Sequence, residues 1–400
     1  MGIVAQPFPF PALPKPPRGA DLPEPSAEAR RHSDRLSEAI RGEIETARGW
    51  IGFARFMELA LYAPGLGYYV AGAAKFGGEG DFVTAPEISP LFGRTLARQI
   101  AQLLERSAGQ VLELGAGSGT MAADVLGELH DSDRLPQRYL ILETSPQLVE
   151  RQQRTLQQRQ PALKDRIEWI SALPENFDGV VVANEVLDAL PVHLVAWRKN
   201  GVFERGVSWK DGFVWSERPL SPGALRDAAE TIGAEAGYVS EIALVAPALV
   251  RSLSAVLRKG ALLLIDYGFG RREYYHPQRS HGTLMCHYRH RAHDDPFFLP
   301  GLQDLTTHVD FTAIAEAGID AGMNMLGYTT QAQFLVNSGI TRLLEQHSAD
   351  PATSRFALTA GVQKLLSPAE MGELFKVIAL GHGIDDPLIG FTSGDKSRLL

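Results

Sequence analysis

The 400-residue chain has one cysteine, Cys286, and no apolar run long enough to span a membrane. A single cysteine excludes a disulfide within the chain and argues against a cysteine-based zinc site, so we expect a reducing compartment. Basic residues are not in excess, and the net charge of -8 argues against a protein that coats nucleic acid. The hydrophobic fraction of 44% supplies the core of one large domain with insertions, or of two domains.

Signal-peptide features are also absent from the N-terminus, where eight prolines occur in the first thirty residues. The segment has no charged start followed by an apolar run, and it lacks the arginine-rich, acid-poor character of a transit peptide. We interpret residues 1–32 as an extended Pro-rich arm. Residues 33–106 are predicted to contain a helix over 33–48, a glycine-rich loop over 71–90 and a helix over 91–106.

Strand and helix patterns alternate through the remaining region, residues 107–400. Apolar strands are predicted at 111–117, 138–144, 167–173, from 178 onward, and at 261–268, 322–330 and 373–381, with helices at 121–130 and 146–160. Near-continuous apolar strands between helices indicate an α/β fold whose parallel sheet is covered on both faces. Two insertions interrupt this pattern, at about 194–240 and 270–305. The first carries the hairpin turn signals Asn200-Gly201 and Asp211-Gly212.

A glycine-rich segment between the first of these strands and the next helix predicts a cofactor site. It reads Glu113-Leu114-Gly115-Ala116-Gly117-Ser118-Gly119-Thr120. The competing interpretation is the dinucleotide fingerprint G-x-G-x-x-G, but the third glycine comes one position too early for it. A carboxylate at Glu113 would repel a pyrophosphate, whereas it suits the cationic amino-acid end of S-adenosylmethionine (SAM). We therefore expect SAM to be bound by Glu113, Gly115, Gly117, Ser118 and Gly119.

Acidic and hydroxyl side chains outside the glycine segment complete the expected cofactor site. Glu143 ends the next strand, where a carboxylate can accept two hydrogen bonds from a ribose diol. The alternative is that the glycines form only a tight turn and Glu143 caps a helix. In the glycine-rich loop, Thr84 and Glu87 are expected to contact the cofactor, with Asp81 and Glu87 closing over it. That loop could instead simply pack on the helix over 91–106.

Several motifs in order resemble one known family. They are Gly67-Tyr68-Tyr69, residues 80–90 (GDFVTAPEISP), the glycine segment 113–120, residues 184–193 (NEVLDALPVH), Asp266-Tyr267-Gly268 and residues 300–311 (PGLQDLTTHVDF). Together they resemble the MidA-like family of SAM-dependent methyltransferases, over about residues 35 to 395. This family includes a mitochondrial complex I assembly factor that acts as a protein arginine methyltransferase.

The resemblance implies a class I methyltransferase fold, which is a Rossmann-like seven-stranded sheet with the last strand antiparallel. For the mitochondrial members it implies symmetric dimethylation of an arginine on a subunit of respiratory complex I. A bacterial member would lie in the cytoplasm and a eukaryotic one in the mitochondrial matrix, although no transit peptide is evident. A homodimer is compatible with the sequence.

Methylation of arginine needs acidic side chains, because the guanidinium is protonated and a poor nucleophile. Glu185 and Asp188 follow the fourth strand, where ligands bind in such sheets, and we expect them to hold the guanidinium. Asn184 is expected to contact the acceptor or SAM. The alternative is that Asp188 caps a helix and Glu185 forms a structural pair.

Other candidates and other functions stay open at this point. Asp266 and Tyr267 could shape the acceptor pocket or be structural, and His308 and Asp310 could relay a proton or hold a loop. The histidines between 276 and 293 have irregular spacing, so no metal site is expected. Competing functions are methylation of a small molecule or another nucleophile, and a SAM-binding assembly protein with little catalysis. A dinucleotide oxidoreductase is disfavoured by the glycine spacing.

Overall fold

The computed structural model describes residues 22–70, 83–347 and 355–400, so most of the Pro-rich arm and much of the glycine-rich loop lie outside the described residues. Its largest sheet has the strand order β15-β16-β10-β5-β2-β3-β4, and β14 pairs with the end of β10. The strands are β2 (Gln110–Leu114), β3 (Arg138–Leu142), β4 (Ile167–Ile170), β5 (Phe177–Asn184), β10 (Leu257–Phe269), β14 (Val309–Asp310), β15 (Asn324–Thr330) and β16 (Phe375–His382). All pairs in this order are parallel except the two that β16 forms, with β10 and with β15. This is the seven-stranded arrangement predicted from the resemblance, with the antiparallel last strand inserted beside β10.

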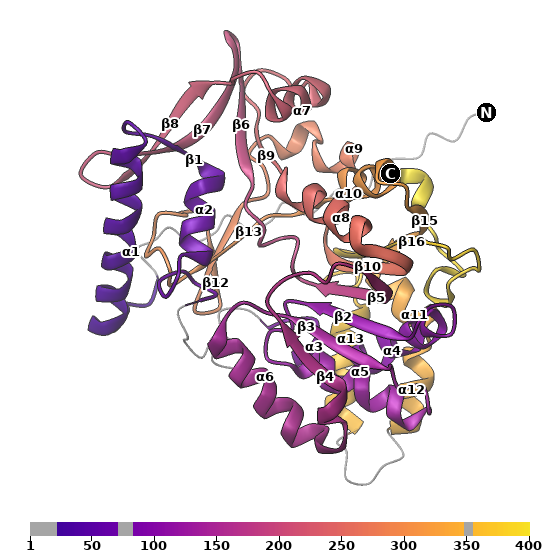
Figure 1. Ribbon diagram of the computed structural model, residues 1–400. Helices are drawn as coiled ribbons and strands as arrows, with labels where there is room; N and C mark the ends of the chain where they lie inside the picture. The colour runs from indigo at the N-terminus through magenta and orange to yellow at the C-terminus, as the bar shows by residue number, and fades with distance from the viewer. Residues whose placement is uncertain (1–21, 71–82, 348–354) are drawn as a thin grey trace, which may run out of the picture.

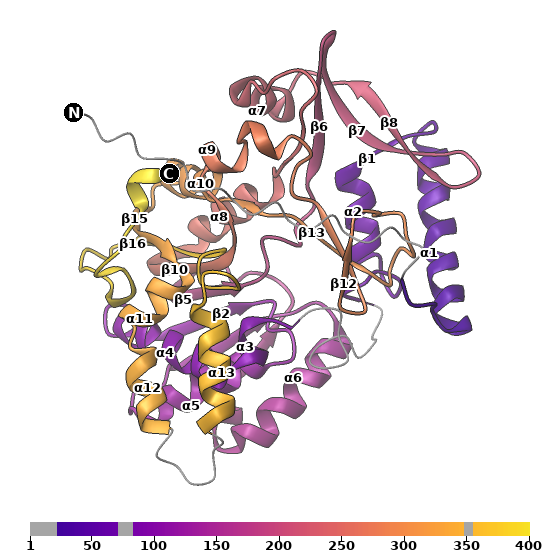
Figure 2. The same ribbon diagram turned by 180° about the vertical axis from the view of Figure 1, so that it is seen from behind.

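Helices cover both faces of this sheet, as a buried parallel sheet requires (Figure 1, Figure 2). Along β10, Leu263 and Ile265 face one core while Leu262 and Leu264 face the other. The first core includes side chains of α4 (Pro90–Leu104), α5 (Thr120–Asp131), α6 (Pro146–Arg159), α11 (Gln331–Asn337), α12 (Ile340–His347) and α13 (Arg355–Leu366). The second core includes α8 (Val245–Val256) and α10 (Phe311–Asp320). Side chains therefore alternate between two apolar layers along each central strand.

A second sheet is antiparallel, and most of its strands follow β5 of the first sheet in the chain. It contains β1 (Ile51–Gly52), β6 (His193–Arg198), β7 (Gly201–Trp209), β8 (Phe213–Pro219) and β9 (Val239–Ile242), with α7 (Ala224–Ile232) between β8 and β9. The hairpin between β7 and β8 turns at Asp211, which has a φ of 53°, and Gly212. Turn residues that tolerate positive φ permit such a tight reversal.

A third, three-stranded sheet is formed within residues 285–306. Its order is β12 (Arg291–His293), β11 (Met285–Tyr288) and β13 (Asp304–Thr306), and α9 (Arg271–Tyr274) precedes it. The N-terminal helices α1 (Ala27–Thr46) and α2 (Phe53–Tyr62) share one apolar cluster with side chains of β7 and β13, such as Val207 and Leu305. The N-terminal helices thus pack on the two smaller sheets and stand apart from α4 to α6 (Figure 1).

The first helix begins six residues earlier than the sequence pattern indicated. Ser26 caps it, because its hydroxyl oxygen accepts a hydrogen bond from the Ala29 amide at 3.2 Å. The buried face of the helix runs through Leu36, Ile40 and Ile44, one turn apart, which is the part that the sequence pattern revealed.

Candidate functional site

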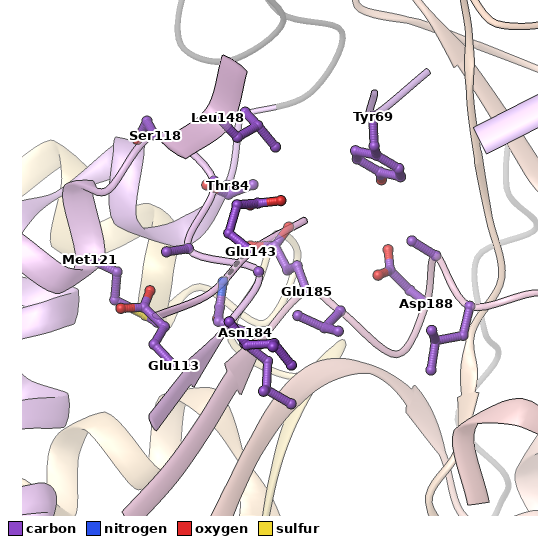
Figure 3. A pocket seen from close by; sticks show the side chains of 18 of the residues that line it. Tyr69, Thr84, Glu113, Ser118, Met121, Glu143, Leu148, Asn184, Glu185 and Asp188 are labelled. Atoms are coloured by element: carbon purple, nitrogen blue, oxygen red, sulfur yellow. Dashed lines mark hydrogen bonds between the residues drawn. The ribbon is translucent and has the colours of Figure 1, made fainter. Parts of the chain in front are cut away.

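A cavity of about 390 Å³ opens at the carboxyl ends of β2, β3, β5 and β10, where ligands bind in sheets of this kind. Figure 3 shows Glu113, Ser118 and Met121 on one side of it, and Asp188 facing Tyr69 on the other. Among the described residues that the sequence analysis assigned to the cofactor or the acceptor, its lining includes all except one: Thr84, Glu87, Glu113, Gly115, Gly117, Ser118, Glu143, Asn184, Glu185 and Asp188. Gly119 is the exception, and it caps the start of α5 just beneath the loop.

The glycine segment has a backbone that other residues would strain. Gly115, Gly117 and Gly119 have φ values of 61°, 54° and 83°, all in the left-handed region. A Cβ on Gly115 would lie 3.1 Å from the side chain of Val186, and one on Gly119 would lie 3.1 Å from the backbone of Gln152. A Cβ on Gly117 would meet no atom within 4 Å, so the backbone there is open to the cavity. Gly115 and Gly117 therefore shape the cavity, whereas Gly119 allows α5 and α6 to pack closely.

Glu143 is held firmly at the end of β3 by hydrogen bonds to both carboxylate oxygens. Its Oε1 accepts from the amides of Thr144 and Ser145 at 2.9 Å each, and its Oε2 accepts from Gln152 Nε2 at 3.1 Å. Gln152 is fully buried and also contacts the Gly117 carbonyl and the Trp169 indole. Oε1 already accepts two hydrogen bonds, whereas Oε2 accepts one and keeps acceptor capacity for a hydroxyl, so a role in holding a ribose stays a prediction that the geometry allows. The sequence analysis missed Gln152, which reads there as one of many polar residues on a charged helix.

Glu113 lies almost completely buried under the glycine segment. Burial raises the pKa of its carboxyl group to about 7, an effect that the Tyr139 hydroxyl partly offsets by donating a hydrogen bond to Oε2 at 2.5 Å. Tyr139, on the neighbouring strand β3, was not anticipated. A cation in the cavity would favour the ionised carboxylate.

The short helix α3 (Ala85–Ile88) connects the two halves of the cavity. Glu87 accepts hydrogen bonds from the hydroxyls of Ser118 and Thr120 in the glycine segment. The Ala85 amide donates to Glu185 Oε1 at 3.1 Å. Glu87 therefore fixes the glycine segment as well as lining the cavity, while the residue predicted to act with it, Asp81, lies outside the described residues.

Glu185 occupies a strained position at the end of β5. Its φ of 52° is in the left-handed region, which costs a non-glycine residue roughly 1–2 kcal/mol. Its Oε1 accepts hydrogen bonds from Asn184 Nδ2 at 3.0 Å and from the Ala85 amide. Burial, and then the nearby charge of Asp188, raise the pKa of Glu185 to about 8. Backbone strain at a residue whose side chain lines a cavity points to a functional position.

Asp188 faces the cavity from the same segment. Burial raises its pKa to about 6, although the Tyr267 hydroxyl stabilises the charged form by donating to Oδ2 at 2.5 Å. Its Oδ1 is buried and, within the described part of the chain, has no hydrogen-bond partner. The same holds for Asn184 Oδ1. Both residues line the cavity, and a buried acceptor without a partner is satisfied by an N–H or O–H donor.

Three of the open candidates have structural surroundings. Asp266 is fully buried, and its carboxylate accepts from the amides of Leu187, Asp188 and Tyr267, so it fixes the turn that carries Asp188. Asp310 caps α10. His308 stacks on Phe269 at 5.2 Å. Neither His308 nor Asp310 lines the cavity, whereas Tyr267 does.

The charge of the cavity lining is strongly one-sided. Six of its residues are acidic, namely Glu87, Glu113, Glu143, Glu185, Asp188 and Asp304, and no described lining residue is basic. Such a lining suits a cationic sulfonium and ammonium and is a poor match for a pyrophosphate. The Gly117 backbone, which lines the cavity, and the anchored Glu143 carboxylate also fit SAM, which supplies an electrophilic methyl group when bound.

The sheet order and this cavity define a SAM-dependent methyltransferase of class I. The chain belongs to the family described as "Putative S-adenosyl-L-methionine-dependent methyltransferase", whose model matches residues 92–329. A Burkholderia thailandensis protein crystallised with bound S-adenosyl-homocysteine is 51% identical to it, with a TM-score of 0.92 over 95% of this chain and 100% of that chain.

Curated relatives agree with this assignment. Protein arginine methyltransferase NDUFAF7, mitochondrial, from Danio rerio is 31% identical over 84% of each chain. The human protein of the same name is 30% identical over 83% of this chain and 80% of its own. The predicted family, fold class, enzyme class and cofactor are thereby confirmed, and the dinucleotide alternative is excluded.

The affinity for SAM is expected to rise with pH between about 6 and 8. The carboxyl group of Glu113 must be ionised to pair with a cation. At a pH below its pKa of about 7 it is mostly protonated, so the cost of removing the proton weakens binding. The measurement is SAM titration by calorimetry at several pH values, on wild type and on Glu113→Gln. The difference between the two proteins isolates Glu113 from the titration of SAM itself. If the SAM affinity of both proteins changed with pH in the same way, Glu113 would not interact with the charge of the ligand.

Proposed function

We propose that the protein transfers a methyl group from SAM to a guanidinium nitrogen of an arginine side chain in another protein. The observation that carries this proposal is the acidic cavity, which has no basic lining residue among those described and has an unpartnered buried oxygen on Asp188. The names of the curated relatives give the same acceptor class.

Glu185 and Asp188 are the residues that we propose hold the acceptor. The guanidinium of arginine stays protonated at physiological pH, so its positive charge must be met by carboxylates when it leaves water. A planar guanidinium can donate paired hydrogen bonds to carboxylates in a fixed orientation. Held in this way, a nitrogen can be aligned with the methyl group, and alignment is the main contribution a protein can make to such a displacement.

Asn184 and Tyr267 are positioning residues in this proposal. Asn184 orients the Glu185 carboxylate through its amide nitrogen, and the Tyr267 hydroxyl orients Asp188. The remaining oxygen of Asn184 can accept a hydrogen bond from the acceptor or from the SAM ammonium group.

The acceptor protein that we propose is a subunit of respiratory complex I, which is what the sequence resemblance implies. For a bacterial chain we propose the cytoplasm as the location, and for a eukaryotic chain the mitochondrial matrix. No helix among the described residues is long and apolar enough to cross a membrane. A homodimer stays a prediction, which light scattering can check.

Transfer of labelled methyl groups tests the proposal directly. The protein is incubated with methyl-labelled SAM and purified complex I subunits, and the labelled residue is identified by mass spectrometry. We expect label on arginine, and none when that arginine is replaced by lysine. Label on a lysine, on a carboxylate or only on small molecules would contradict the proposed acceptor while leaving the methyltransferase assignment intact.

A further inference from the structure

The half of the cavity away from the glycine segment has a third carboxylate that the motif analysis did not single out. Asp304 belongs to β13 of the three-stranded sheet and is only 7% exposed, yet it lines the cavity together with Glu185 and Asp188. It is separated from Asp188 by more than one hundred residues along the chain. The fold brings them together by a hydrogen bond of 3.0 Å from the Thr307 amide to the Asp188 carbonyl.

We propose that Asp304 is a substrate-binding residue, which holds the acceptor guanidinium from the side opposite Asp188. The inference rests on the proposed function and adds to it the element that distinguishes arginine from lysine. Asp304 would accept from one edge of the planar cation while Asp188 accepts from the other.

The Tyr69 hydroxyl orients the Asp304 carboxylate. The Tyr69 hydroxyl lies 3.0 Å from both Oδ1 and Oδ2. It carries one proton, whereas an ionised carboxylate offers about four acceptor positions. Tyr69 therefore fixes the direction of the carboxylate without using up its capacity to accept further hydrogen bonds.

Two tyrosines form the aromatic wall beside Asp304. The rings of Tyr62 and Tyr69 stack with centroids 5.5 Å apart, and the Tyr62 hydroxyl donates a hydrogen bond to the Ala189 carbonyl at 2.9 Å. Tyr69 and Asp188 lie on the same side of the cavity, away from Glu113 (Figure 3). A planar cation between these groups would gain cation–π attraction in addition to its ion pairs.

The charges of both aspartates act on the same two hydroxyl groups. Burial, and then the charges of Asp304 and Asp188, raise the pKa of Tyr62 above its ordinary value. Burial raises the pKa of Tyr69 as well, and the charges of both aspartates contribute there too. Both carboxylates therefore face one shared space, and both tyrosines stay neutral donors at physiological pH.

This arrangement suits arginine better than lysine for a geometric reason. A guanidinium carries five N–H donors spread over a rigid plane, so it can reach carboxylates on two sides at once. An ammonium is a compact point charge that cannot span two separated acceptors equally well. The side chain that completes this subsite comes from the insertion over 270–305, which places a determinant of acceptor choice outside the large sheet.

Binding of a guanidinium probe tests the role of Asp304 without requiring methyl transfer. The probe is agmatine, with butylamine as the ammonium counterpart, and binding is followed by ligand-observed NMR in the presence of saturating S-adenosyl-homocysteine. We expect wild type to prefer agmatine, and Asp304→Asn to weaken agmatine binding by about tenfold or more. Affinity for S-adenosyl-homocysteine should stay within about twofold, because Asp304 lies away from the glycine segment.

Two further variants separate binding from a purely structural role. Tyr69→Phe removes the hydrogen bond that orients Asp304 but keeps both the carboxylate and the ring, so it should weaken agmatine binding clearly less than Asp304→Asn does. Asp294→Asn alters an exposed carboxylate in the same insertion and should match wild type. If Tyr69→Phe loses agmatine as completely as Asp304→Asn, the pair is a structural tether and the inference is wrong.

The remaining outcomes distinguish this inference from the proposed function. If Asp304→Asn binds agmatine like wild type while Asp188→Asn does not, Asp304 has no part in acceptor binding, but the proposed function stands. If wild type binds neither agmatine nor butylamine and labels no arginine, the proposed function fails and the inference falls with it.

Discussion

Replacing Gly115 with valine is expected to abolish SAM binding, with a loss of affinity of at least about 100-fold. The residue has a φ of 61°, a conformation in which a β-branched side chain is severely disfavoured. A Cβ there would already lie 3.1 Å from Val186, in the segment that carries Glu185 and Asp188. The variant must therefore rebuild the loop that lines the cavity, and the rebuilt loop would obstruct the space for the ligand.

The control for this experiment is Gly109→Val. Gly109 also has a positive φ, 74°, but its nearest neighbour would be Gln137 at 3.7 Å and it does not line the cavity. Both variants carry similar backbone strain, so both should lose some thermal stability, and only Gly115→Val should lose SAM in calorimetry. Equal SAM affinity in the two variants would place the cofactor elsewhere.

Exchanging Asp188 for asparagine is expected to lower kcat/KM for the protein acceptor by at least about 100-fold, a size typical for loss of a charged group that meets a buried cation. The affinity for SAM should stay within about threefold, because Asp188 lies on the side of the cavity facing Tyr69 (Figure 3). Tyr267→Phe is the matched variant, since it removes the hydroxyl that orients Asp188 and keeps the carboxylate. It should lose much less activity than Asp188→Asn.

The pH dependence of turnover gives an independent measure of these carboxylates. Burial raises the pKa of Asp188 to about 6 and that of Glu185 to about 8, so both are partly protonated near neutrality before a cation binds. Because the acceptor pairs with the ionised forms, kcat/KM should rise between about pH 6 and 8. In Glu185→Gln the upper part of this rise should disappear. A pH profile that is the same in both proteins would remove Glu185 from the proposed acceptor site.

The sequence alone determined the class of fold and the cofactor half of the cavity. Apolar strands alternating with helices specify a sheet buried on both faces, because each strand must contact a helix layer above and below. Gly115 and Gly117 could be recognised because a strand, a left-handed turn and a helix follow one another without interruption in the chain. Glu143 was readable for the same reason, since it ends the next strand and all parallel strands end at one edge of the sheet.

Only the tertiary structure decided which side chains meet these motifs. Gln152 anchors Glu143, and Tyr139 donates to Glu113, but neither is marked by any local pattern. Asp266 looked like a rim residue in the sequence, and its three backbone donors show that it fixes a turn. Asp304 enters the cavity from a separate sheet. Short sequence patterns indicate the backbone conformation of a few neighbouring residues. Burial, raised pKa values and contacts between distant segments arise only when the chain has packed.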